Sequence, residues 1–235
     1  MSKICPESNT TVLYLDCLDC DSKSCRKVKS YKYAKVVIGI DQSYKNTGIS
    51  ISADGELKLV KSIFLESYKS NSEKRRVLSN NLDNALKSVV PKAKEVICIV
   101  ERIRLRSQGF LNINYIKSIG ALNSIIVDKC SEYNVPVYSV DTRCWKAQIV
   151  GTSKPSNNPK YAMEPEKYPT FAWLKKQNNG KFIKSVMIDM SNNRKSKNVF
   201  EKSGKRYKVN DDACDSAAIS MFGFKGDKSK LQKEE

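Results

Sequence analysis

The stretch Val36-Val-Ile-Gly-Ile-Asp41-Gln-Ser-Tyr-Lys-Asn-Thr-Gly48 decides the fold. Its apolar run is nearly continuous, which is typical of a strand at the centre of a sheet that is covered on both faces. We therefore predict a core strand over Lys35 to Asp41, which places a carboxylate at the carboxyl end of that strand. Asn46-Thr47-Gly48 predicts a turn after it.

The segments that follow complete an α/β pattern. Asp54-Gly55 marks a hairpin, so the first three strands are antiparallel, and helix and strand then alternate. Further strands are predicted at Ile49 to Ala53, Leu57 to Leu65, Val96 to Glu101 and Val135 to Val140, and helices at about Ser72 to Val90, at about Leu111 to Tyr133 and from Thr142 onward. This order predicts a mixed, five-stranded sheet with helices on its faces.

No histidine occurs among the 235 residues. Without imidazole the chain cannot build a Ser-His-Asp or Cys-His nucleophile, a two-cysteine, two-histidine zinc finger, a paired-histidine metalloprotease helix or a histidine general base. Any hydrolytic chemistry must therefore come from carboxylates, lysine, cysteine or a bound metal.

The charge is strongly positive, because 42 Lys and Arg residues against 25 Asp and Glu residues give +17. Nucleic acid is the default partner for such a surplus, and a solvated lysine surface is the alternative. No apolar run approaches the ~20 residues of a membrane span, and no signal-peptide stretch opens the sequence. We expect a soluble, cytoplasmic protein without a membrane partner.

Acidic residues stand where strand and helix ends would bring them together. Asp41 closes the first core strand, and Glu101 closes the fourth. Asp212 and Asp215, three positions apart at the start of a predicted helix, share one helix face. Such an oxygen-rich cage suits Mg²⁺, and two ions about 4 Å apart can cleave a phosphodiester without histidine.

Each acid also has a purely structural explanation. The alternatives are an Asx turn at Asp41, an ion pair of Glu101 with Arg102 or Arg104, and dipole compensation by Asp211 and Asp212 behind an Asn210 cap. The joint occurrence of the acids at the positions of one cage favours the metal site. Asp211 can share the face of Asp215 as well, so the choice between Asp211 and Asp212 stays open.

Three acidic motifs resemble those of RuvC, the Holliday-junction resolvase with an RNase H-like fold. They are Ile-Gly-Ile-Asp41-Gln-Ser-Tyr-Lys-Asn-Thr-Gly48, Val-Ile-Cys-Ile-Val-Glu101 and Asp212-Ala-Cys-Asp215-Ser-Ala-Ala-Ile. The segment Trp145-Lys-Ala-Gln-Ile-Val-Gly151 is similar to the family segment that carries a basic residue. The resemblance covers about residues 35–151 and 209–222.

The resemblance implies a site and a reaction. Asp41, Glu101, Asp212 and Asp215 would bind two Mg²⁺ or Mn²⁺ ions, and Lys146 would lie near the scissile phosphate. The implied protein is a homodimeric crossover-junction endodeoxyribonuclease that acts in DNA recombination and repair. It would resolve four-way DNA junctions by making paired nicks. A nuclease for RNA–DNA hybrids or flaps, or a non-catalytic zinc-bearing DNA-binding protein, is the alternative.

The chain departs from the cellular family in ways that resemble resolvases of phages and mobile elements, so a bacterial or phage-infected cell is expected. The aromatic residue that usually follows the motif-two glutamate by three positions is Arg104 here, and Phe110 is the candidate substitute for the junction-opening wedge. The residues assigned to DNA binding are Arg102, Arg104, Arg106, Phe110 and Lys154. A solvated loop is the alternative explanation for the arginines.

A basic insertion lies at about residues 152–208. Residues 151–210 hold fourteen basic side chains against four acidic ones, with seven aromatic residues between them. The rings either stack on bases or form a local core, and the length of the segment favours the core. Phe182 to Ile188 predicts a strand within it.

The eight cysteines fall into an N-terminal group of four and four that are widely separated along the rest of the chain. Four lie within the first 25 residues, and the spacing Cys17-Leu-Asp-Cys20 allows two thiolates to share one cation. With Cys5 and Cys25 they predict a tetrahedral zinc site, with unliganded thiols as the alternative. Cys98, Cys130, Cys144 and Cys214 are predicted as small core residues. The predicted domains are a Cys-rich module (1–30), a nuclease domain (31–225) and a charged tail (226–235).

Overall fold

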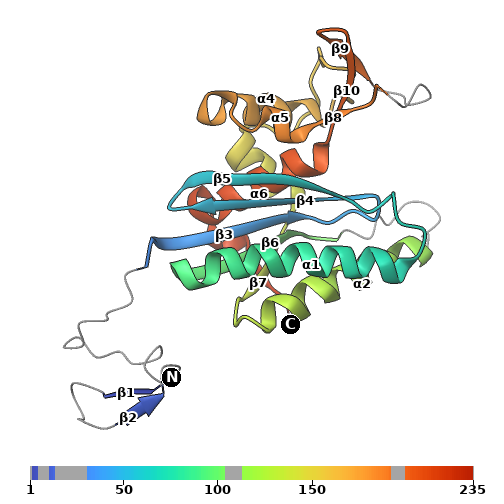
Figure 1. The fold of residues 1–235 in the computed structure, drawn as a ribbon. Helices are drawn as coiled ribbons and strands as arrows, with labels where there is room; N and C mark the ends of the chain where they lie inside the picture. The colour runs from blue at the N-terminus through green and yellow to red at the C-terminus, as the bar shows by residue number, and fades with distance from the viewer. Residues whose placement is uncertain (1, 5–10, 14–30, 104–112, 192–198, 235) are drawn as a thin grey trace. The chain divides into compact units, whose positions relative to one another are not determined.

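The computed structural model describes residues 2–4, 11–13, 31–103, 113–191 and 199–234 (Figure 1). The chain divides into two compact units, Met1–Lys32 and Tyr33–Glu235. In the first unit, β1 (Ser2–Ile4) pairs antiparallel with β2 (Thr11–Leu13). The predicted zinc ligands Cys5, Cys17, Cys20 and Cys25 lie outside the described residues.

The second unit is built on a mixed sheet with the strand order β11-β7-β6-β3-β4-β5. The strands are β3 (Tyr33–Asp41), β4 (Asn46–Ala53), β5 (Glu56–Phe64), β6 (Ala93–Glu101), β7 (Val137–Val140) and β11 (Gln232–Lys233). Strands β3, β4 and β5 form an antiparallel meander, whereas β6 and β7 run parallel to β3. The predicted mixed α/β sheet is confirmed.

Two details of the predicted sheet are wrong. The sheet has six strands among the described residues rather than five, because β11 in the charged C-terminal segment pairs with Tyr138 and Ser139 of β7. A polar two-residue strand has no apolar pattern to reveal it. Asn46-Thr47-Gly48 is not a turn, because Asn46 already pairs with Phe64 and begins β4.

The helices that cover the sheet follow the predicted order. They are α1 (Asn71–Val89), α2 (Ile113–Ser131), the short α3 (Thr142–Trp145) with the π-helical turn η3 (Lys146–Val150), and α6 (Asp211–Lys225). Short 3-10 turns lie at Val90–Lys92 and Lys228–Lys230. Ser70 and Glu73 form a capping box at the start of α1, which satisfies the free N–H groups there. None of the described helices is long and apolar enough to cross a membrane.

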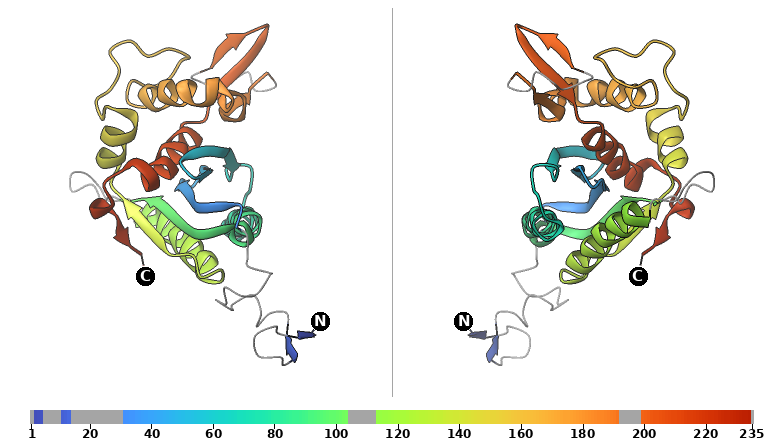
Figure 2. Two further views of the ribbon diagram at one scale, coloured as in Figure 1. Left: turned by 90° about the vertical axis from the view of Figure 1, so that its left-hand side faces the viewer. Right: turned by 90° about the vertical axis from the view of Figure 1, so that its right-hand side faces the viewer.

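The sheet separates two layers of helices. Val36, Ile38 and Ile40 of β3 pack into the core beneath α1 and α2. The alternate residue Val37 packs with Ala218 and Phe222 of α6 on the other face. Figure 2 shows α6 and the two long helices on opposite sides of the sheet. Because side chains alternate along a strand, Asp41 has the same parity as Val37 and faces the α6 side.

Helix α6 approaches the sheet unusually closely. A Cβ atom built on Gly48 would lie 1.9 Å from the backbone oxygen of Asp212, and one on Gly39 would lie 2.4 Å from that of Ser216. The buried hydroxyl of Ser50 donates to the Ser216 carbonyl at 2.7 Å. Only glycine permits this contact, so the sheet sequence fixes the position of the helix that carries the last two acids.

The basic insertion forms its own small layer beside α6. Its elements are α4 (Tyr168–Lys176), η4 (Gln177–Gly180), α5 (Ile183–Val186), β8 (Met187–Asp189), β9 (Phe200–Lys202) and β10 (Lys205–Val209). The predicted strand at Phe182 to Ile188 is wrong over most of its length. Phe182 and Val186, four positions apart, are both buried, which is a helical spacing.

The aromatic residues of the insertion form a local core. The Tyr161 ring lies 5.2 Å from that of Phe171 and 5.0 Å from that of Phe200 in edge-to-face contacts. These rings pack with Val209 and with Ala213 of α6 in one apolar cluster. The packing confirms the core explanation over base stacking for these rings.

The single cysteines are largely core residues, as predicted. Cys98, Cys130 and Cys214 are buried free thiols, whereas Cys144 is partly exposed.

Candidate active site

Three acidic side chains from distant parts of the chain meet at one end of the sheet. Asp41 and Glu101 end the neighbouring parallel strands β3 and β6, and Asp215 comes from the first turns of α6. One carboxylate oxygen of each lies within 4.8 Å of the others. The parallel pairing of β3 and β6 causes this, because it places both carboxyl ends at the same edge of the sheet.

Glu101 is held in place through both of its carboxylate oxygens. Thr142 Oγ1 donates to Oε1 at 2.8 Å, and the buried Trp145 donates through Nε1 to Oε2 at 3.2 Å. Gln42 Nε2 donates to the Glu101 carbonyl at 2.6 Å, which ties the ends of β3 and β6 together. The sequence did not single out Thr142, Trp145 or Gln42 as supports of Glu101, because their contacts are long-range.

Helix α6 presents its acids from a capped N-terminus. The Asn210 Oδ1 accepts a hydrogen bond from Ala213 N at 2.9 Å, so Asn210 caps the helix, as the structural explanation of Asp211 and Asp212 assumed. Asp211 is ion-paired, with its Oδ2 2.8 Å from the Lys167 Nζ. Asp212 is not one of the three acids whose oxygens lie within 4.8 Å of one another, but its charge, like that of Asp211, raises the pKa of Asp41.

The predicted basic residue Lys146 lies beside this cluster. Its Nζ is 3.5 Å from Asp215 Oδ2 and 5.1 Å from the centre of the Trp145 ring. The contact places a cation at the rim of the carboxylates, where Lys146 lowers the pKa of Asp215.

Burial and mutual repulsion hold the carboxylates far from their ordinary acidity. Burial, followed by the charges of its acidic neighbours, raises the pKa of Asp41 well above its usual range. Burial also raises the pKa of Glu101, that of Asp212 to about 8 and that of Asp215 to about 7. Ionising the whole cluster at neutral pH therefore requires additional positive charge.

A divalent cation fits these residues. The buried Asp215 Oδ1 has no hydrogen-bond partner among the described residues. An all-oxygen donor set of carboxylates is the set that Mg²⁺ prefers, and it needs no histidine. The acids that converge here therefore have the chemistry of a metal site.

Comparison with solved structures gives the fold. Thermus thermophilus RuvC in complex with a Holliday junction substrate matches 85% of this chain and 99% of its own at 13% identity, with a TM-score of 0.54. Thermus thermophilus RuvC by itself matches the same shares at 13% identity with a TM-score of 0.51. The chain has the RuvC fold. No protein-family model matches the sequence, and no curated protein matches it.

Within the RuvC fold, the remaining predicted residues are only partly placed. Arg102 directly follows Glu101, and its Nε donates to Ser139 Oγ at 3.5 Å rather than to the Glu101 carboxylate. Lys154 is exposed. Arg104, Arg106 and Phe110 lie outside the described residues, so the DNA-binding roles of the two arginines and the wedge role of Phe110 stay predictions.

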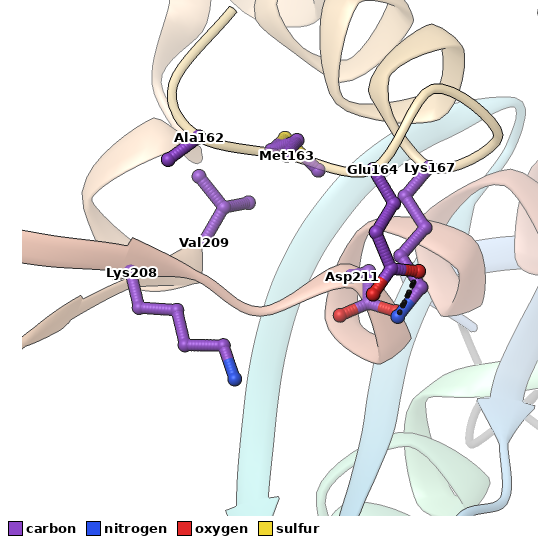
Figure 3. A pocket seen from close by; sticks show the side chains of 7 residues that line it. All are labelled: Ala162, Met163, Glu164, Lys167, Lys208, Val209 and Asp211. Carbon is purple, nitrogen blue, oxygen red and sulfur yellow. Dashed lines mark ion pairs between the residues drawn. The ribbon is translucent and has the colours of Figure 1, made fainter. Parts of the chain in front are cut away.

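A pocket opens next to the acids, between the insertion and the start of α6 (Figure 3). Its lining residues are Ala162, Met163, Glu164, Lys167, Lys208, Val209 and Asp211. Lys167 bridges Glu164 at 3.3 Å and Asp211 at 2.8 Å, so an ion-pair network joins the insertion to the helix that carries Asp212.

Proposed function

We propose that this protein is a metal-dependent endodeoxyribonuclease that resolves four-way DNA junctions by paired nicks. The observation that carries the proposal is the convergence of Asp41, Glu101 and Asp215 within 4.8 Å at the carboxyl end of a RuvC-like sheet. The positive charge of +17 supports a polyanionic substrate. The Thermus thermophilus RuvC that shares the fold is described with a Holliday junction substrate.

In this proposal the four acids Asp41, Glu101, Asp212 and Asp215 hold two Mg²⁺ or Mn²⁺ ions. Such ions supply a nucleophile from bound water at neutral pH and offset charge on the leaving oxygen.

The neighbouring residues perform the other tasks. Thr142 and Trp145 orient the Glu101 carboxylate through the two hydrogen bonds that it accepts. Lys146, 3.5 Å from Asp215, stabilises negative charge that develops on the cleaved phosphate. The exposed Lys154 and the basic residues Arg102, Arg104 and Arg106 contact the DNA backbone, with Phe110 as the wedge.

Paired nicks require two active sites, and a symmetric homodimer supplies them. The zinc proposed for Cys5, Cys17, Cys20 and Cys25 is a structural ion, separate from the catalytic acids.

The deciding experiment compares three labelled substrates, a four-way junction, an RNA–DNA hybrid and a linear duplex, under single-turnover conditions with Mg²⁺. We expect symmetric incision of the junction and little cutting of the other two. Preferential cutting of the hybrid would assign the site to a different nuclease. Tight junction binding without incision, in either Mg²⁺ or Mn²⁺, would favour a non-catalytic zinc-bearing DNA-binding protein.

A further inference from the structure

The three-stranded sheet β8-β10-β9 of the insertion ends in a tight hairpin between β9 and β10 (Figure 1). Lys202 of β9 and Lys205 of β10 are direct cross-strand partners, and both are exposed. Ser203 and Gly204 between them have φ values of 52° and 71°. Two consecutive positive φ values define the two-residue type I′ turn, which fixes the register of the strands. The two ammonium groups are therefore carried on a preorganised arm.

This placement of lysines does not stabilise the hairpin. Like charges directly opposite each other in antiparallel strands are unfavourable. Asp189 approaches Lys205 to only 4.0 Å in an exposed pair, which is worth little. The hairpin is anchored instead by its base, where the Phe200 ring lies 5.0 Å from Tyr161 and 6.0 Å from Tyr207. The aromatic rings therefore stabilise the hairpin, and the two exposed lysines at its tip are available to bind an external anion.

Strand β10 joins this tip to the acidic cluster. Lys208, near the inner end of the same strand, lines the pocket beside Asp211 (Figure 3). The chain then passes through Asn210 into α6. Seven positions separate Lys205 from Asp212, which is an extended span of at most about 25 Å. About seven base pairs of B-DNA have that axial length.

We propose that Lys202 and Lys205 form a phosphate-contacting surface for a duplex arm of the DNA substrate. The contacted phosphates lie within about seven base pairs of the phosphate at the acidic cluster. The surface reads backbone charge alone, so it supplies affinity and orientation without base preference. The identity of the substrate rests on the proposed function.

The test compares two matched double variants of the full chain. K202Q/K205Q removes the hairpin charges. K92Q/K94Q removes two exposed lysines, Lys92 just before β6 and Lys94 at its amino end, which is the opposite end from Glu101. Dissociation constants for a four-way junction and a linear duplex are measured in EDTA between about 50 and 200 mM salt. We expect K202Q/K205Q to make the slope of the log association constant against log salt less steep by about 1.8 on both DNAs. The control variant should leave this slope unchanged.

Two further measurements distinguish a lost phosphate contact from a loss of stability or of catalysis. The thermal midpoint of both variants and the single-turnover rate at saturating enzyme are expected to stay at the wild-type values, because the substituted lysines are exposed and belong neither to an apolar cluster nor to the acidic cluster. An unchanged slope in K202Q/K205Q, or an equal fall in both variants, overturns the proposal. A chain that cuts no junction yet shows the hairpin-dependent slope contradicts the proposed function and supports this surface. A chain that binds neither DNA overturns both.

Discussion

Asp211 and Asp212 are adjacent in sequence but differ in their partners. The Asp211 carboxylate is ion-paired with Lys167 at 2.8 Å, whereas burial, followed by the neighbouring carboxylates, raises the pKa of Asp212 to about 8. We predict that Asp212→Asn and Asp41→Asn each lower the junction-cutting rate by at least about a hundredfold, while Asp211→Asn stays within about threefold of wild type. Single-turnover cleavage and junction affinity are measured for all three. An inactive Asp211→Asn beside an active Asp212→Asn would move the ligand by one residue.

Lys146 acts on the reaction more than on affinity if it faces the cleaved phosphate. We predict that Lys146→Ala lowers the single-turnover rate at saturating enzyme by about a hundredfold and leaves the junction dissociation constant within a few-fold. Since Lys146 lowers the pKa of Asp215, the pH at which the remaining activity is half-maximal should rise. Weaker binding with an unchanged rate would make Lys146 an ordinary phosphate contact.

The raised pKa values of the acids imply a pH-dependent stability of the metal-free protein. Asp212 titrates near 3.8 when unfolded and at about 8 in the folded chain, and Asp215 at about 7. The folded state binds more protons between these values, so stability falls as pH rises from about 5 to 8. In EDTA we predict a thermal midpoint that drops by several degrees over this range, because 1 kcal/mol shifts it by about 2–4 °C.

Two changes to the same melting experiment test whether repulsion between the buried acids causes this decline in stability. Asp212→Asn should flatten the decline and raise the midpoint at pH 8, and added Mg²⁺ should restore the wild type, because an ion that binds only the folded state stabilises it. A midpoint in EDTA that is independent of pH would show that the acids are not forced together.

The close packing of helix α6 on the sheet depends on two glycines, Gly39 and Gly48. We predict that Gly48→Ala destabilises the protein by about 3 kcal/mol, because the added methyl meets the backbone of Asp212, which cannot move aside like a flexible side chain. Chemical denaturation measures the free energy of unfolding, and cleavage assays should show a matching loss of activity.

Gly120→Ala is the control for this substitution. Gly120 lies within α2 with no atom within 4 Å of an added Cβ. Alanine there should stabilise the chain by up to about 1 kcal/mol through helix propensity. A Gly48→Ala protein as stable as wild type would show that α6 can shift away from β4 at little cost.

Elements with a strong local pattern were predictable, and those defined by distant partners were not. The buried run of β3 and the Asn210 cap of α6 each follow from neighbouring residues, and the structure has both. Strand β11 exists only because β7 offers it an edge. The helix α5 was misread as strand because two buried residues at helical spacing resemble an apolar run in so short a segment.

The same division holds for the acidic cluster. Asp41, Glu101 and Asp215 were predictable because each ends or begins an element with a clear pattern. Their supports were not, because Trp145 reaches Glu101 across 44 positions and Lys167 reaches Asp211 from the insertion. Hydrogen bonds of this range have no signature in a single sequence.

At the scale of the whole molecule, the two compact units predict a modular protein. If the four N-terminal cysteines share an ion, elemental analysis should find about one zinc per full chain. A chain that begins at Tyr31 should lose that zinc and keep its Mg²⁺-dependent cutting of junctions. Full zinc stoichiometry after the truncation would move the ligands to the cysteines of the second unit, of which Cys98, Cys130 and Cys214 are buried.

The acidic cluster combines Asp41, from early in the chain, with Asp215, from near its carboxyl end. The order in which these residues are synthesised has a consequence. The ribosome releases β3 to β7 before α6, together with most of the positive charge that attracts DNA. A growing chain can therefore bind nucleic acid well before α6 emerges, but it lacks the last carboxylates. Under the proposed function, an interrupted chain that stops before Asp215 is a DNA-binding fragment that cannot break the genome of its own cell.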